Sequence, residues 1–187
     1  INAVGIDISQ QAVTYGQTEG LDIRLGDLLF LDDFRVDSFD VITFWASIEH
    51  LFLPKQTLQK ARTLLKPDGV IIVETGNINS YLARIFKSKW RIIEADHNYY
   101  FSSSTLDDLL DRTGFDIIRT DNDGFVESMI FQFGLSEFIM RTFTKSSSNS
   151  RQRSSSLKQQ INRMASRLQL GDIMIKYARK KSLNSIQ

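Results

Sequence analysis

The sequence has no cysteine and only two histidines, and each shortage excludes a kind of chemistry. Without cysteine there is no disulfide framework, no thiolate nucleophile and no thiolate ligand for a metal ion. His50 and His97 alone are too few for a zinc centre of the usual kind, so the sequence predicts no metal site. No run approaches the roughly 18 consecutive apolar residues of a membrane span, and none is expected.

The composition is that of a globular protein. The 187 residues are 42% hydrophobic and 24% charged, and this length predicts a single domain over residues 1–187. The sequence opens at Ile1 rather than Met and enters an apolar segment without a charged leader, so we expect a part of a larger protein. A cytoplasmic location is the simplest expectation.

The charges are unevenly distributed along the chain. Residues 1–140 hold 12 Lys or Arg against 21 Asp or Glu, whereas residues 141–187 hold 11 against 1. Such a basic segment could contact phosphate or an anionic surface. It lacks regularly interleaved aromatic residues that would stack on bases, so we favour a solvated face that balances an acidic body, with no nucleic-acid partner.

The segment from residue 39 to residue 77 predicts an α/β fold. Phe39–Trp45 is β-branched, aromatic and apolar on both faces, which is typical of a buried central strand. Pro54 suits the first turn of a helix, and a second strand is expected at Val70–Glu74. Between them, apolar residues recur at helical spacing: Leu58, Ala61, Leu64 and Leu65. The order strand, helix, strand is the order of a parallel sheet.

The rest of the chain continues this alternation. Further strands are expected at 3–8, 21–25, 115–120 and 172–178, and helices at 10–17, 78–86, 106–113, 125–143 and 157–168. Ser9 is the expected cap of the first helix, and Gly114 is the expected end of the helix at 106–113. The serine-rich residues 144–156 predict a flexible loop.

Two acids stand where strands are expected to end, and ligands of open α/β sheets bind beyond those ends. Asp7 could accept both hydroxyls of a ribose, or it could simply be an acid at a helix N-terminus. Asp27 could accept the amino group of an adenine, or it could be a turn residue. The two acids predict a nucleotide-like ligand without identifying it.

The two histidines are the candidate proton acceptors. His50, beside Glu49, follows the third strand and could take a proton near neutral pH, although a histidine that pins the loop is an equal alternative. His97 lies in an aromatic segment, Trp90–Ser104, which is either a lid over the substrate or a small aromatic core.

Three strings resemble the class I S-adenosylmethionine-dependent methyltransferases: FDVITFWASIEHL, LLKPDGVIIVETGN and DHNYYFSSSTLDDLLDRTGF. They are similar to the branch with an E-H-hydrophobic element after a strand and an H-x-x-x-F-S element before a late helix. The resemblance covers about residues 4–120, and the later GDIMIKYARK is similar to the family's last strand. It implies a Rossmann-like, doubly wound, mostly parallel sheet with an antiparallel last strand.

The resemblance also implies a cofactor, S-adenosylmethionine, and a small-molecule acceptor. Asp7 would bind the cofactor ribose and Ile8 would pack on the adenine, while Asp27, with Leu28 beside it, would bind the adenine amino group. The stretch from Trp45 to His50 would border the methyl group and the acceptor. His50 and His97 would act as the base or would position the acceptor.

One element of the family pattern is missing. The first strand and its glycine-rich loop should lie about 20 residues before Asp7, and that strand would stand between those of Asp7 and Phe39. We therefore expect an N-terminally incomplete domain with an interrupted sheet. The preferred function is methyl transfer as the C-terminal part of a larger enzyme. The alternatives are a noncatalytic binding or scaffold module that has lost the loop, and a nicotinamide or nucleotide-sugar enzyme.

Overall fold

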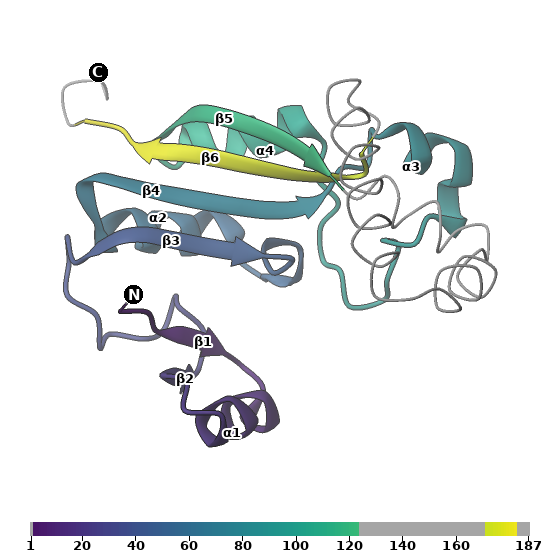
Figure 1. The fold of residues 1–187 in the computed structure, drawn as a ribbon. Helices are drawn as coiled ribbons and strands as arrows, with labels where there is room; N and C mark the ends of the chain where they lie inside the picture. Colours follow the sequence, from purple (N-terminus) through teal and green to yellow (C-terminus); the bar gives the residue numbers. More distant parts are fainter. Residues whose placement is uncertain (1, 124–170, 183–187) are drawn as a thin grey trace, which may run out of the picture.

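The computed structural model describes residues 2–123 and 171–182, and in this part the strands form two sheets (Figure 1). In the smaller sheet, β1 (Gly5–Asp7) is parallel to β2 (Ile23–Leu25). The larger sheet has the order β3 (Phe39–Trp45), β4 (Leu65–Gly76), β6 (Ile173–Lys180), β5 (Phe115–Asp123). β3 is parallel to β4, and β6 is antiparallel to both of its neighbours. The predicted α/β fold with an antiparallel last strand is confirmed.

Four α-helices accompany the described strands: α1 (Gln10–Thr18), α2 (Pro54–Leu64), α3 (Tyr81–Phe86) and α4 (Ser103–Arg112). Ser9 caps α1 as predicted, because its side chain accepts the N–H of Ala12. α4 begins earlier than predicted, because Ser102 and Thr105 form a reciprocal capping box. The chain leaves α4 through Gly114, whose φ of +88° is a conformation that glycine adopts readily.

The prediction that Phe39–Trp45 is a buried central strand is wrong. β3 is an edge strand of the larger sheet, and Val41 and Trp45 are 48% and 51% exposed. The reason is that β1, the neighbouring strand in Figure 1, pairs with β2 and not with β3 in the described part of the chain. Within residues 2–123 and 171–182, the predicted interruption between the strands of Asp7 and Phe39 is therefore present, and β1 and β3 each have an unpaired edge.

β4 is longer than its predicted core of Val70–Glu74. Phe39 pairs with Leu65 and Val41 with Val70, so residues 66–69 loop out of the ladder and the strand resumes after them. This places Glu74 opposite Trp45, at the same edge of the sheet.

The main core lies between the larger sheet and helices α2 and α4, which both lie behind the sheet in Figure 1. Its fully buried members come from both helices, from β4, β5 and β6, and from the segment after β3: Ile48, Leu58, Ala61, Leu65, Ile71, Val73, Leu106, Leu110, Phe115, Met174 and Ala178. Leu28, which follows β2, packs against this core. The smaller sheet is thereby attached to the larger one through its connecting segment.

Lysines of the basic segment pair with acids of the body where the structure describes them. Lys176 pairs with Asp107, Lys180 with Asp37 and Lys181 with Asp111. The elements predicted at 125–143, 144–156 and 157–168 lie outside the described residues. Across residues 2–123 and 171–182, no helix is long and apolar enough to cross a membrane.

Candidate functional site

Asp7 and Asp27 lie at the carboxyl ends of the two strands of the smaller sheet. The N–H of Gly26 donates to the carbonyl oxygen of Asp7 at 2.9 Å, which holds these two strand ends together. One carboxylate oxygen of Asp7 accepts the N–H of Ser9 at 2.7 Å, and one of Asp27 accepts the N–H of Leu29 at 2.8 Å. Asp7 therefore does act as an acid at a helix N-terminus, and Asp27 does act as a turn residue. Within the described residues, neither second carboxylate oxygen has a hydrogen-bond partner, so each fits a ligand hydroxyl or amino group.

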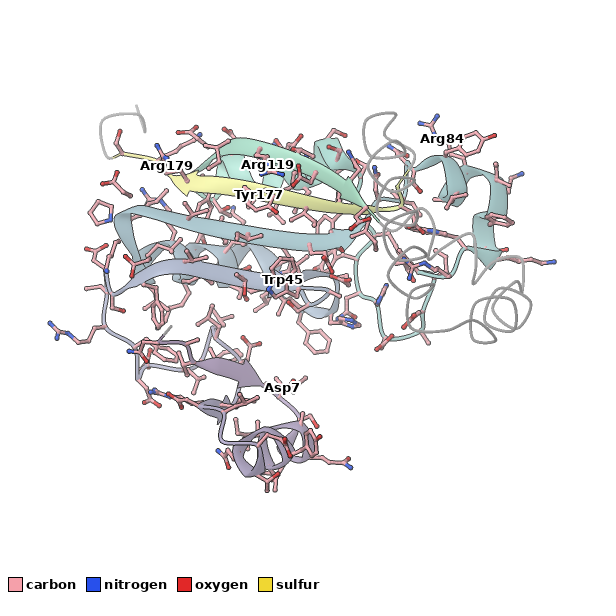
Figure 2. All side chains as sticks on the ribbon, viewed as in Figure 1. Asp7, Trp45, Arg84, Arg119, Tyr177 and Arg179 are labelled. Carbon is pink, nitrogen blue, oxygen red and sulfur yellow. The ribbon has the colours of Figure 1, made fainter. Side chains whose placement is uncertain are left out.

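The apolar residues predicted beside these acids differ in exposure. Ile8 is 78% exposed immediately after β1, and Trp45 is half exposed at the end of β3. Figure 2 shows Asp7 and Trp45 at the carboxyl ends of their strands, on the same side of the molecule. Leu28 instead packs on the main core, so little of its side chain remains for a ligand.

The chain turns sharply at Ala46, directly after β3. Its φ of +42° lies in the left-handed region, which is strained for alanine, and its N–H donates to the carbonyl of Glu74 at 3.2 Å. The turn leads into the short 3-10 helix η1 (Ile48–His50), which lies against the segment 94–100. The N–H groups of Asn98 and Tyr99 donate to the carbonyl of Glu49 at 2.9 and 3.1 Å.

The structure brings the two predicted histidines together. Their rings meet edge to face, with centroids 4.6 Å apart and an interplanar angle of 82°. Nδ1 of His50 lies 3.1 Å from the carbonyl oxygen of Asp96 and 3.6 Å from its carboxylate, so His50 does pin the loop. The ring of His97 lies 5.7 Å from that of Tyr100, so His97 does belong to an aromatic cluster. Contact between the histidines makes a shared role in proton transfer or acceptor binding feasible.

Two glutamates add negative charge to this region: Glu49, within the predicted border from Trp45 to His50, and Glu74, which was not predicted as a site residue. Glu49 is only 3% exposed, and its Oε2 has no hydrogen-bond partner among the described residues. Glu74 lies near the end of β4, opposite Trp45, and its pKa is raised, first by burial and then by the negative charges of Glu49 and Asp123. The available signal for Glu74 was its position at a strand end, where an acid is easily overlooked among turn residues.

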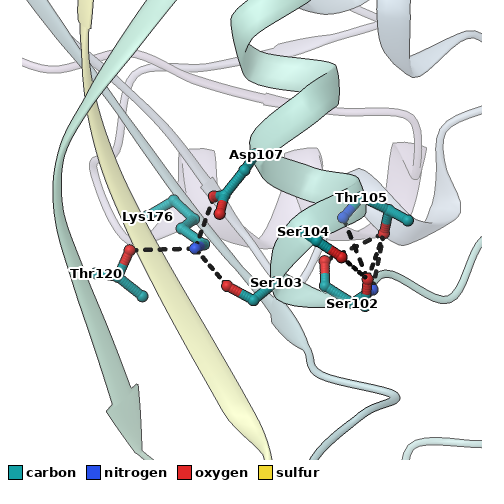
Figure 3. Close-up of polar contacts among 7 residues, drawn as sticks. All are labelled: Ser102, Ser103, Ser104, Thr105, Asp107, Thr120 and Lys176. Atoms are coloured by element: carbon teal, nitrogen blue, oxygen red, sulfur yellow. Dashed lines mark hydrogen bonds and ion pairs between the residues drawn. The ribbon is translucent and has the colours of Figure 1, made fainter.

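A second feature that the sequence did not reveal is a polar pocket of about 390 Å³ between β4, β5 and α4. Its lining is formed by Asn77, Asn79, Ser80, Ser103, Ser104, Asp107, Thr120 and Asn122. Beside it lies Lys176, which is 2% exposed and points its ammonium group at three of these side chains (Figure 3). Nζ donates to Ser103 Oγ at 2.6 Å and to Thr120 Oγ1 at 3.1 Å, and lies 2.7 Å from Asp107 Oδ1. The lysine is fully occupied in joining α4 to β5.

Comparison with known proteins identifies the family to which this fold belongs. Residues 1–120 match the methyltransferase domain family, Methyltransf_23. The chain therefore belongs to the methyltransferase domain family, as the sequence motifs predicted, and S-adenosylmethionine is the methyl donor of this class.

Particular relatives are similar over parts of the chain or in fold. The ubiquinone biosynthesis O-methyltransferase of Haemophilus ducreyi is 35% identical over 65 residues, which are 35% of this chain and 26% of that protein. The chain thus matches about a quarter of that relative. A SAM-dependent methyltransferase structure from Thermotoga maritima superimposes with a TM-score of 0.64 at 19% identity, covering 95% of this chain and 72% of that one. A SAM-dependent methyltransferase structure from Archaeoglobus fulgidus superimposes with a TM-score of 0.64 at 17% identity, covering 96% of this chain and 76% of that one.

Proposed function

We propose that this chain is part of an S-adenosylmethionine-dependent methyltransferase that acts on a small-molecule acceptor. The observation that carries the proposal is that candidate ligand-binding groups follow the strand ends of both sheets: two acids with free carboxylate oxygens and exposed Ile8 and Trp45, with the paired histidines in the segments after β3 and before α4. Family membership supports methyl transfer in general. The acceptor and the residue roles below are the proposed part.

In this proposal, the smaller sheet holds the cofactor. The free oxygen of Asp7 accepts the ribose hydroxyls, Ile8 covers one face of the adenine, and Asp27 accepts the adenine amino group. When bound, the cofactor supplies an electrophilic methyl group that an acceptor atom takes by in-line displacement. Such a reaction depends mainly on alignment of the two partners, for which Trp45 provides a half-exposed wall.

The histidines supply the proton chemistry. The His50 Nδ1–H donates to the carbonyl of Asp96, which leaves Nε2 with the lone pair needed to accept a proton from the acceptor. His97, in contact with His50, positions the acceptor or shares that proton.

The free edges of β1 and β3 support the further proposal that the active enzyme is larger than this chain. A strand between them would join the smaller sheet, with its cofactor acids, to the larger sheet, with its histidines. The same interruption favours the second candidate, a noncatalytic binding or scaffold module, because it separates the two halves of the site.

Calorimetric titration with S-adenosylhomocysteine tests the proposal. Asp7→Ala should weaken binding by about 1 to 3 kcal/mol, since charge-assisted hydrogen bonds to the ribose are lost. Asp68→Asn, an exposed acid in the looped-out residues 66–69, is the matched control and should bind as the unmodified chain does. Equal affinity of the Asp7→Ala variant would remove Asp7 from the site.

The unmodified chain also distinguishes the alternatives. A folded full-length protein that binds neither S-adenosylhomocysteine nor NAD would favour the noncatalytic module. Binding of NAD alone would favour the nicotinamide enzyme. Circular dichroism of each sample confirms that folded protein is being titrated.

A further inference from the structure

We propose that Glu49, His50 and His97 form a binding site for one divalent transition-metal ion. Each of these residues offers one ligand atom, and the three atoms lie within 4.8 Å of one another. Two imidazoles and one carboxylate suit zinc, cobalt, iron or manganese, whereas magnesium and calcium prefer sets of oxygen ligands. The scarcity of histidine argued against a metal in the sequence, but both histidines meet at this one place.

Two buried polar groups in the cluster lack partners within the described residues. Oε2 of Glu49 has no hydrogen-bond partner, and the residue is only 3% exposed, so water does not replace one. Nδ1 of His97 is also buried and without a hydrogen bond. Buried carboxylate and imidazole atoms are costly when they lack a hydrogen-bond partner, so these two atoms favour a bound ligand or ion. A cation held by the three residues satisfies both groups at once.

The ligands are already held in place by their surroundings. Nδ1 of His50 is bonded to the carbonyl of Asp96, so the ring is oriented and its Nε2 is free for a metal. The two segments that supply the ligands are tied together by further bonds. The side chain of Asn98 donates to the carbonyl of His50 at 2.7 Å, and Tyr99 Oη donates to that of Phe52 at 3.2 Å. Metal binding therefore needs only a small contraction of side chains.

A second group also has its ligand atoms within 4.8 Å of one another. It consists of Glu94, Asp96 and the same His97. Glu94 and Asp96 are exposed, so their carboxylates are hydrated and need no ion. Burial and the two orphaned atoms favour the set with Glu49.

Three protein ligands leave a coordination position open. A hydroxyl group of an acceptor bound there would have a lowered pKa and would become a better nucleophile. This role rests on the proposed methyl transfer, whereas metal binding itself does not. With the ion bound, the lowered pKa of the hydroxyl would take the place of proton acceptance by His50 Nε2, whose lone pair would then bind the metal.

The test is metal titration of the chain after treatment with a chelator. Calorimetry with Zn²⁺ should give one ion per chain, and Glu49→Gln and His97→Asn should each weaken binding by at least about tenfold. Glu94→Gln is the matched control and should change the affinity by less than about twofold. Circular dichroism shows whether each variant is folded.

A measurement on the unmodified chain avoids dependence on variants. Since the sequence has only two histidines, ¹⁵N NMR shows two imidazole rings, and Zn²⁺ should shift the nitrogens of both. The proposal is overturned if neither Zn²⁺, Co²⁺ nor Mn²⁺ binds, if only one ring responds, or if Glu94→Gln abolishes binding while Glu49→Gln does not. Titration with S-adenosylhomocysteine is a separate experiment, so failure of the cofactor proposal and failure of the metal proposal are distinguishable.

Discussion

Replacing the buried Lys176 by methionine should cost more stability than any surface charge. Its Nζ makes two hydrogen bonds and one ion pair, to Ser103, Thr120 and Asp107 (Figure 3). Each charge-assisted bond contributes about 1.5 to 3 kcal/mol, but the ammonium group also pays several kcal/mol of desolvation. The Asp107 side chain is 40% exposed and regains water when the lysine is lost. We therefore expect Lys176→Met to lower the unfolding free energy by about 2 to 3 kcal/mol.

The assay is urea unfolding followed by circular dichroism, with thermal unfolding as a second measure. A loss of this size corresponds to a fall in Tm of roughly 4 to 12 °C for a domain of this length. Lys66→Met is the matched control, because its partner Asp40 is 80% exposed and a surface pair contributes at most about 1 kcal/mol. The reasoning would be refuted if Lys176→Met lowered the unfolding free energy by no more than Lys66→Met does.

Three further predictions concern local features. Glu74→Gln should stabilise the chain near neutral pH but not in acid, since the raised pKa makes ionisation of native Glu74 unfavourable as pH rises; unfolding measured against pH checks this. Ser102→Ala should cost about 1 kcal/mol in urea unfolding by removing the cap of α4, and an unchanged midpoint would contradict it. Gly114→Ala should cost about 1 kcal/mol or more, because φ is positive and the added Cβ would meet Arg62; unchanged thermal unfolding would count against this.

Features set by neighbouring residues could be predicted from the sequence. The cap at Ser9, the helix beginning at Pro54 and the helix end at Gly114 each depend on a few adjacent side chains, and all three are present. The α/β class followed from periodicity alone. The position of β3 could not be predicted in the same way. Its apolar pattern predicts a buried strand. Its exposure in the structure depends instead on which strand lies beside it.

In the candidate site, too, some features could be predicted from the sequence and others depend on the fold. Asp7 and Asp27 could be found because acids at strand ends are visible in the sequence. The contact between His50 and His97 depends on bonds between segments about 46 residues apart, such as that from His50 to the carbonyl of Asp96. The raised pKa of Glu74 likewise depends first on burial and then on the charges of Glu49 and Asp123, all of which only the fold provides.

The position of β6 has a consequence for the order in which this protein can fold during synthesis. β6 pairs with β4 on one side and β5 on the other, so those two strands have no contact in the ladder until residues 173–180 arrive. A ribosome-bound chain that ends before β6 exposes the inner edges of β4 and β5, each a template for pairing with another nascent chain. Pairings over such long sequence separations are also slow to form. The larger sheet is therefore completed only after residues 173–180, which follow β5 in the sequence, have been made.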